Sequence, residues 1–141
     1  VFLLRSPIDI AARTAWGEAR GEGLHGMQAV LNVVGNRVAQ PGWWGHDIVS
    51  VCTTRSQFSC WNQTDPNRVA LLHVTLADAQ FQQAFDLAGQ LSRQMLPDIT
   101  GGADHYYDWR STKPSWAKNN FYTKTLGHHE FYRIGLKGNS Q

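Results

Sequence analysis

Residues 12–38 read ARTAWGEARGEGLHGMQAVLNVVGNRV, a pattern that encodes two consecutive helices. Apolar residues recur at helical spacing up to Gly17, and they recur again after a glycine-rich junction as far as Val38. Two of the three glutamates in the chain, Glu18 and Glu22, lie in this junction, four residues apart. The stretch therefore predicts a helical pair with two of the chain's few glutamates at its corner.

The rest of the chain extends this helical pair. Residues 41–67 are polar and rich in tryptophan and glycine, which predicts a long, partly ordered loop. A capping-box-like start at Thr75 and Asp78 precedes an apolar stripe and predicts a third helix. Short aromatic runs at 105–107 and 130–134 predict extended segments. The expected fold class is mainly α (α+β), with a small extended or β region near the C-terminus.

The composition limits what such a chain does. Its length of 141 residues fits a single domain, residues 1–141. With 42% hydrophobic and 17% charged residues, the chain has enough apolar material for a core and too little charge for a disordered tail. The net charge is only +2 and the arginines are scattered, so no nucleic-acid partner is expected. No apolar run reaches the ~18 residues of a membrane span, so no stable membrane insertion is expected.

Glu18 is the candidate catalytic residue. A carboxyl at a helix end, beside glycines that let a polymer approach the backbone, suits a general acid. Trp16 offers an apolar wall that disfavours the charged form of a carboxyl group. Glu22 is a candidate second carboxylate. The structural alternative is that Glu22 caps the second helix while Glu18 pairs with Arg13 or Arg20.

The polar loop carries residues typical of carbohydrate binding. Residues 57–62 read QFSCWN, and sugar rings stack on aromatic faces while their hydroxyls meet amides. Trp43 and Trp44 would extend such a platform, and the alternative is that these tryptophans anchor the loop to the core. With two C-terminal segments included, the predicted substrate-binding residues are Gln57, Phe58, Ser59, Trp61, His105, Tyr106, Tyr107 and His129.

Histidines and cysteines raise the questions of a metal and of a disulfide. His105 and His129 lie in segments that also carry acidic residues, but there is neither a His-x-x-x-His pair on a helix nor a Cys-x-x-Cys motif. We therefore predict no metal and no other cofactor. Cys52 and Cys60 are too few for a disulfide framework. We predict one disulfide between them, and the alternative is a pair of reduced, buried thiols.

Several segments, in order along the chain, resemble the cell wall hydrolase family of the spore cortex-lytic enzyme SleB. Together they span most of the sequence, and the Gly-Glu-Ala-Arg-Gly-Glu motif is the most specific of them. The resemblance is to the bacteriophage members that serve as endolysins or virion lysins. The segments are residues 12–22, 36–38, 57–59, 102–107, 113–117 and 127–133.

This resemblance implies a lysozyme-like domain that cleaves the glycan strands of peptidoglycan between N-acetylmuramic acid and N-acetylglucosamine. The first glutamate of the motif, Glu18, is the implied catalytic acid/base, and lytic transglycosylase chemistry, which needs no metal, is the implied reaction. The implied place of action is the bacterial cell wall, in the host periplasm or wall during phage lysis or from a virion. A monomer is expected.

Three alternatives to a lytic transglycosylase stay open from the residues. A second carboxylate such as Glu22 would allow muramidase-type hydrolysis with water. The six histidines leave room for a zinc N-acetylmuramoyl-L-alanine amidase that cuts the muramoyl–peptide bond. A non-catalytic cell-wall-binding module would use the aromatic side chains for binding, and Glu18 and Glu22 would then only stabilise helices.

Overall fold

Helix α1 (Pro7–Ala19) carries the first part of the acidic motif. Its start is fixed by Ser6, whose hydroxyl accepts a hydrogen bond from the backbone N–H of Asp9, and by proline at the first helical position. The computed structural model, which describes residues 5–54 and 57–138, continues this helix beyond the expected end at Gly17. A short 3-10 turn, η1 (Arg20–Glu22), follows directly. Glu18 therefore lies in the last turn of α1.

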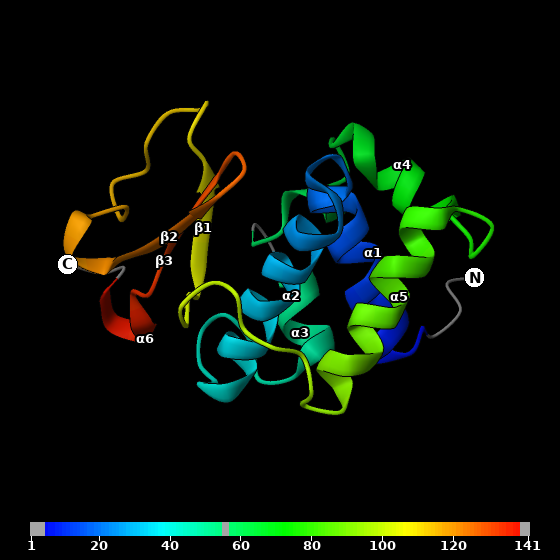
Figure 1. The fold of residues 1–141 in the computed structure, drawn as a ribbon, viewed down its shortest axis with the longest axis horizontal. Coiled ribbons are helices and arrows are strands. Elements are labelled where there is room, and N and C mark those ends of the chain that lie inside the picture. Colours follow the sequence, from blue (N-terminus) through cyan, green and yellow to red (C-terminus); the bar gives the residue numbers. More distant parts are fainter. Residues whose placement is uncertain (1–4, 55–56, 139–141) are drawn as a thin grey trace.

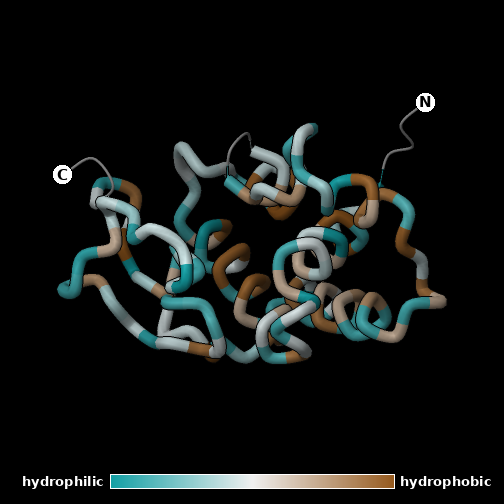
Figure 2. Tube along the Cα trace, turned by 90° about the horizontal axis from the view of Figure 1, so that it is seen from above, coloured by the Kyte–Doolittle hydropathy of each residue, from teal (hydrophilic) through white to brown (hydrophobic). Residues whose placement is uncertain are grey.

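Helix α2 (Gly23–Ala39) is the predicted second helix. It packs against α1 and against α5 (Ala79–Ser92), and these three helices enclose most of the apolar core. Figure 1 shows the three helices side by side on one side of the molecule, and Figure 2 shows that they carry much of its hydrophobic sequence. No helix in the described part of the chain is both long enough and apolar enough to cross a membrane.

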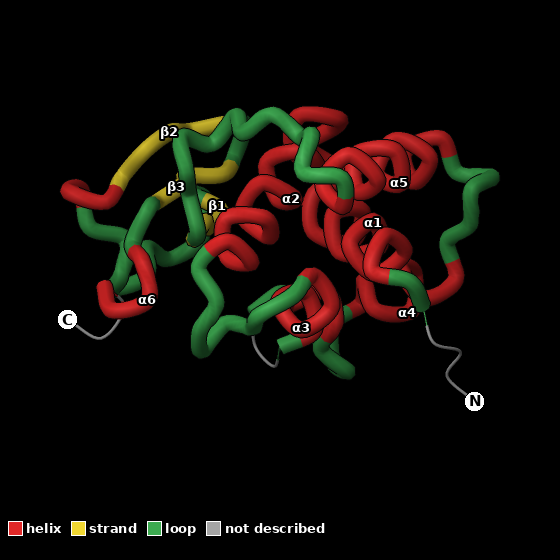
Figure 3. The backbone as a smooth tube through the Cα atoms, turned by 90° about the horizontal axis from the view of Figure 1, so that it is seen from below, coloured by secondary structure: helices red, strands yellow, loops and turns green. Residues whose placement is uncertain are grey.

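The region predicted as a long loop contains more helix than expected. Helix α3 (Ile48–Thr53) begins at a complete capping box formed by Asp47 and Ser50. A 3-10 turn, η2 (Ser59–Trp61), and helix α4 (Pro66–His73) follow it. Figure 3 shows α3 beneath α2, and α3 packs on both α1 and α2. Helices this short are stable only through such packing, so apolar periodicity does not reveal them.

The third predicted helix starts as expected and ends early. Asp78 caps α5 by accepting a hydrogen bond from the backbone N–H of Phe81 at 2.9 Å. The apolar stripe predicted a helix as far as Met95, but α5 ends at Ser92. Gln94 then adopts a left-handed backbone conformation with φ 57°, which a helix cannot continue through.

A small antiparallel sheet forms the other side of the molecule (Figure 1). Strands β1 (His105–Asp108) and β3 (His129–Tyr132) match the predicted extended segments, and β2 (Tyr122–Leu126) was not predicted. The strand order is β1-β3-β2. A 3-10 turn, η3 (Asn119–Phe121), precedes β2, and the last described helix is α6 (Gly135–Gly138).

The two faces of this sheet have different neighbours. Tyr106 and Phe131 are paired in register and pack with the main core on the helical side. Tyr132 belongs to a second, smaller cluster on the opposite side, against which Tyr107 and Trp116 pack. Because side chains alternate along a strand, adjacent residues of β1 point to opposite faces. The face toward the helices is therefore the one that meets the acidic motif.

Candidate active site

The carboxylate of Glu18 lies between the helices and the sheet and accepts hydrogen bonds on both oxygens. The phenolic hydroxyl of Tyr106 donates to Oε1 at 2.5 Å. The backbone N–H of Cys60 donates to Oε2 at 3.0 Å, and the hydroxyl of Ser59 donates to the same oxygen at 3.4 Å. The side chain is therefore oriented by β1 on one side and by η2 on the other.

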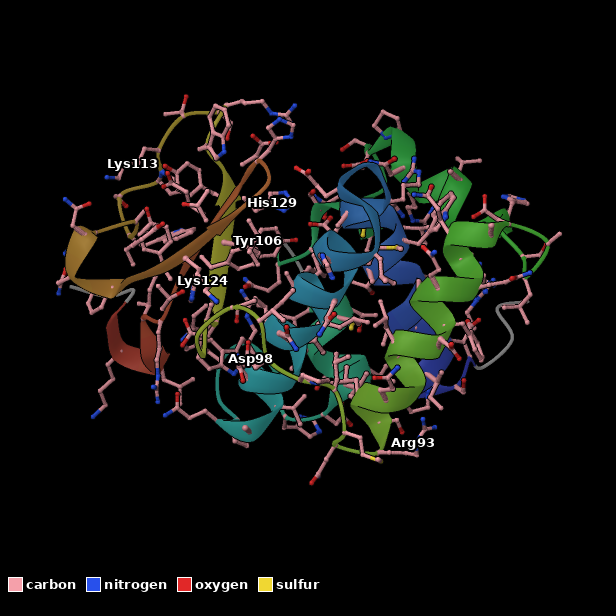
Figure 4. The ribbon with its side chains drawn as sticks, in the orientation of Figure 1. Arg93, Asp98, Tyr106, Lys113, Lys124 and His129 are labelled. Atoms are coloured by element: carbon pink, nitrogen blue, oxygen red, sulfur yellow. The ribbon has the colours of Figure 1, made fainter. Side chains whose placement is uncertain are left out.

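Tyr106 is a neutral partner for this carboxylate. Burial raises the pKa of its phenol well above the usual value, and the charge of Glu18 and the hydrogen bond to it raise that pKa further. Its ring is held by Phe58 and His129, whose ring centroids lie 6.4 and 5.0 Å away. Figure 4 shows Tyr106 and His129 together between the sheet and the helices. A hydroxyl both donates and accepts, so Tyr106 is able to contact Glu18 in either of its protonation states.

Gly17 explains how η2 comes so close to Glu18. A Cβ at this position would lie 3.0 Å from Cβ of Cys60 and 3.0 Å from a methyl carbon of Leu71. With no side chain at Gly17, the 3-10 turn rests directly on α1, and the Cys60 N–H then reaches the carboxylate one residue further on.

Glu22 holds the turn between β2 and β3. Its Oε1 accepts hydrogen bonds from the backbone N–H of His128 at 3.1 Å and from Nδ1 of the same residue at 2.9 Å. Gly127 has φ 57°, and a Cβ there would lie only 2.8 Å from Oε2 of Glu22. His128 was not among the predicted site residues, although it stands next to His129 in the Gly-His-His run at residues 127–129.

The structural alternative for the two glutamates is met only in the position of Glu22. Glu22 occupies the N-cap position of α2, but its side chain makes no capping hydrogen bond. Arg13 forms its ion pair with Asp9, and Arg20 donates to the side chain of Asn67 and to backbone carbonyls. Neither arginine forms an ion pair with Glu18 within the described residues.

His129 is buried beside Tyr106 and carries no charge at neutral pH. Burial lowers the pKa of its imidazole below 6.5, and the negative charges of Glu22, Asp108 and Glu18 oppose this shift only in part. His129, one of the predicted substrate-binding residues, thus lies beside the partner of Glu18 as an uncharged ring.

The residues of the predicted carbohydrate-binding loop have different surroundings in the structure. Ser59 reaches Glu18, whereas Phe58 is buried and Trp61 donates its indole N–H to the hydroxyl of Thr14 at 2.9 Å. Gln57 accepts a hydrogen bond from Arg37 at 3.2 Å. A cavity of about 580 Å³ opens next to this loop. Its lining residues are Thr53, Thr54, Phe58, Trp61, Asn62, Gln63 and Thr64.

The structure does not bring His105 and Tyr107 to Glu18. Both lie on the other face of β1, because they alternate with Tyr106. His105 is buried against Asp104, with Nδ1 2.9 Å from its carboxylate, and its ring contacts tryptophans. Tyr107 donates to Glu130 at 3.0 Å.

The predicted disulfide is not formed, which corrects the expectation for Cys52 and Cys60. Both are free thiols and both are fully buried. Burial raises the pKa of the Cys52 thiol to about 12 and that of Cys60 still further, so both stay protonated. The Cys60 thiol faces the backbone carbonyl of Thr14 at 3.9 Å. Among residues 5–54 and 57–138, no group of three or more His, Cys, Asp or Glu side chains is placed to hold a metal ion.

Two solved structures are similar in fold to this chain. The chain superposes on the catalytic domain of the germination-specific lytic transglycosylase SleB from Bacillus anthracis with a TM-score of 0.68, at 24% identity, covering 94% of this chain and 100% of that one. For the catalytic domain of the Bacillus cereus SleB protein, the TM-score is 0.64 at 23% identity, covering 94% of this chain and 95% of that one. At these identities the likeness shows a shared fold.

The sequence itself gives the family. No curated protein sequence matches the chain. The family model described as Cell Wall Hydrolase matches residues 21–132, which include Glu22, both segments that hold the Glu18 carboxylate, and the whole sheet. Glu18 lies three residues before the matched range. The chain belongs to the Cell Wall Hydrolase family.

Proposed function

We propose that residues 1–141 form one catalytic domain that cleaves the glycan strands of peptidoglycan as a lytic transglycosylase, with Glu18 as general acid and then general base. The observation that carries the proposal is the single carboxylate held on both oxygens by Tyr106, Cys60 and Ser59. The fold shared with two SleB catalytic domains, one of them described as a lytic transglycosylase, supports the reaction class.

In the first step Glu18, in its protonated form, gives its proton to the glycosidic oxygen. The bond between that oxygen and C1 of N-acetylmuramic acid breaks, and positive charge develops on the sugar ring as an oxocarbenium-like state. Tyr106 keeps the carboxyl group in position through this change, because its hydroxyl is able to act as hydrogen-bond donor to the carboxylate that forms.

In the second step the carboxylate of Glu18 removes the proton from the 6-hydroxyl of the same muramic acid. The 6-oxygen then attacks C1 and closes a 1,6-anhydro ring, and no water is consumed. One carboxylate thus serves as acid and base in turn, and it ends the cycle protonated as it began. The neutral imidazole of His129, which packs on Tyr106, adds no competing charge to this site.

The position of Glu22 favours this route over hydrolysis with water. In a muramidase with two carboxylates the second one activates water or attacks C1. In this chain Oε1 of Glu22 is engaged by two donors of His128. We therefore assign Glu22 to holding the β2–β3 turn rather than to chemistry.

Substrate binding is assigned to the surface around Ser59. The cavity beside it is lined by threonines, amides and the rings of Phe58 and Trp61, which is the mixture that a saccharide requires. Tyr106 and His129 form the opposite, sheet side of the site. The resemblance to phage proteins extends the proposal to an endolysin or virion lysin that acts as a monomer on the bacterial wall.

The test is mass spectrometry of purified peptidoglycan digested with the wild type and with Glu18→Gln. We expect 1,6-anhydromuropeptides from the wild type and a loss of about 10²–10⁴-fold in their rate of release from the variant. Glu130→Gln is the matched control, because Glu130 lies on the opposite face of the sheet and contacts Tyr107 and Tyr132. Muropeptides with reducing ends would show that the enzyme is a muramidase instead. Free peptide stems would show that the enzyme is an amidase. A Glu18→Gln variant that stays active would overturn the role of Glu18.

A further inference from the structure

Two separate parts of the chain hold the Glu18 carboxylate. Tyr106 in β1 contacts one oxygen, and the N–H of Cys60 in η2 contacts the other. Neither segment belongs to α1, so both bonds form together only if β1 and η2 are fixed relative to each other. A displacement of about 1 Å at either segment would break the geometry that acid–base chemistry needs.

We propose that Arg37, in the last turn of α2, is a positioning residue that fixes these two segments around the carboxylate. Its Nε donates to the backbone carbonyl oxygen of Asp104 at 2.8 Å, two residues before Tyr106. Its Nη1 donates to Oε1 of Gln57 at 3.2 Å, at the start of the segment that leads into η2. One planar guanidinium therefore joins both sides of the site. This inference rests on the proposed role of Glu18.

The neighbouring side chain strengthens the link to β1. Asn36 donates to the backbone carbonyl oxygen of Ala103 at 2.8 Å, so consecutive residues of α2 bind consecutive carbonyls. The chain that enters β1 is held at two points, and β1 then pairs with β3 from His105 onward. These contacts hold the chain just before the strand that carries Tyr106.

The burial of Arg37 shows that it does more than fill space. Arg37 is only 4% exposed, and its guanidinium carbon lies 5.3 Å from the ring centroid of Phe58 and 5.7 Å from that of Trp44. Within the described part of the chain, its hydrogen bonds go to a carbonyl and an amide rather than to a carboxylate. An apolar side chain would occupy this place without the cost of burying a charge. The arginine adds directed N–H bonds, and it places a positive charge near the phenol of Tyr106.

The test uses two variants that cut the link at different points. Arg37→Met keeps most of the volume, and Gln57→Leu removes only the acceptor on the η2 side. We measure kcat and KM on soluble glycan strands freed of peptide stems, with 1,6-anhydro ends as product. Each variant is expected to lower kcat by about 10–100-fold and to leave KM within about twofold. Arg37→Lys keeps the positive charge, but its single ammonium group cannot reach both acceptors as the planar guanidinium does. Its kcat is therefore expected to lie between those of Arg37→Met and the wild type.

Arg13→Met provides the matched control. Arg13 is also a buried arginine, it lies over the ring of Phe81, and it donates to the backbone carbonyls of Leu71 and Val74. Its contacts join α1 to the C-terminal end of α4 and to α5, and they do not involve η2 or β1, the segments that hold Glu18. We expect Arg13→Met to lower the melting temperature as Arg37→Met does, and to leave kcat of the folded enzyme unchanged.

The double variant completes the experiment. If Arg37 acts through Gln57, Arg37→Met with Gln57→Leu is expected to be no slower than the slower single variant. The inference is overturned if the two single variants lower kcat no more than Arg13→Met does, or if only KM changes. If Arg37→Met does not fold, the kcat of Gln57→Leu compared with that of Arg13→Met decides the question alone. If Glu18→Gln abolishes product while these variants are fully active, only this inference fails, whereas an active Glu18→Gln removes the proposed function itself.

Discussion

The phenolic hydroxyl of Tyr106 donates a hydrogen bond to Oε1 of Glu18, from strand β1 to helix α1. The two residues stand 88 positions apart in the sequence, and this contact joins the helical part of the molecule to the sheet at the site of the proposed chemistry. In the proposed mechanism, this contact keeps the phenol in hydrogen-bond contact with Glu18 in both of its protonation states.

Tyr106→Phe is expected to lower kcat by about 10–100-fold with little change in KM, because the ring stays in place and only the donor to Glu18 is lost. The measurement is the rate of 1,6-anhydro product formation on soluble glycan strands. Tyr107→Phe is the control, since Tyr107 lies on the opposite face of β1 and donates to Glu130. Equal rates for both variants would show that the Tyr106 hydroxyl does not serve catalysis.

Glu22→Gln separates the two glycan-cleaving mechanisms. The amide oxygen of glutamine still accepts from the backbone N–H of His128, so the β2–β3 turn keeps that bond. A transglycosylase that relies on Glu18 alone is expected to retain its rate within about threefold. A loss as large as that of Glu18→Gln, measured on the same muropeptides, would instead assign Glu22 a part in the chemistry.

The sequence was sufficient to predict the helical pair with Glu18 at its corner, because strong apolar periodicity and glycines mark both. It was not sufficient to tell Tyr106 from Tyr107. Adjacent residues of a strand point to opposite faces, and only the packing of the sheet on α1 and α2 shows which face meets Glu18.

Other features depended on tertiary contacts in the same way. Helix α4 has eight residues, begins at an Asp65–Pro66 cap, and is stabilised by packing on α1. The cysteine prediction failed: a spacing of eight residues allows a disulfide, but Cys52 and Cys60 are free thiols in the core. The contact of Glu22 with His128 could not be predicted from the sequence, because the two residues are 106 positions apart in the chain.

Thiol titration tests the state of Cys52 and Cys60. With the pKa of Cys52 raised to about 12 by burial, and that of Cys60 raised as well, neither is a thiolate at neutral pH. We expect no reaction of the native protein with Ellman's reagent, and two reactive thiols per chain in concentrated guanidinium chloride without reductant. No reaction in the unfolded protein would show a disulfide between the two cysteines.

The pH dependence of stability tests the state of His129. Burial lowers the pKa of this imidazole in the folded protein below the value of about 6.5 in the unfolded chain, so the unfolded state takes up the proton more readily. The stability that neutral His129 contributes is therefore complete above about pH 6.5 and is lost as the pH falls below that value.

We expect His129→Gln to lose less unfolding free energy than the wild type between neutral and mildly acidic pH in urea titrations. His25→Gln, at an exposed histidine of α2, is expected to follow the wild type. Parallel losses in all three proteins would contradict a neutral, buried His129 beside Tyr106.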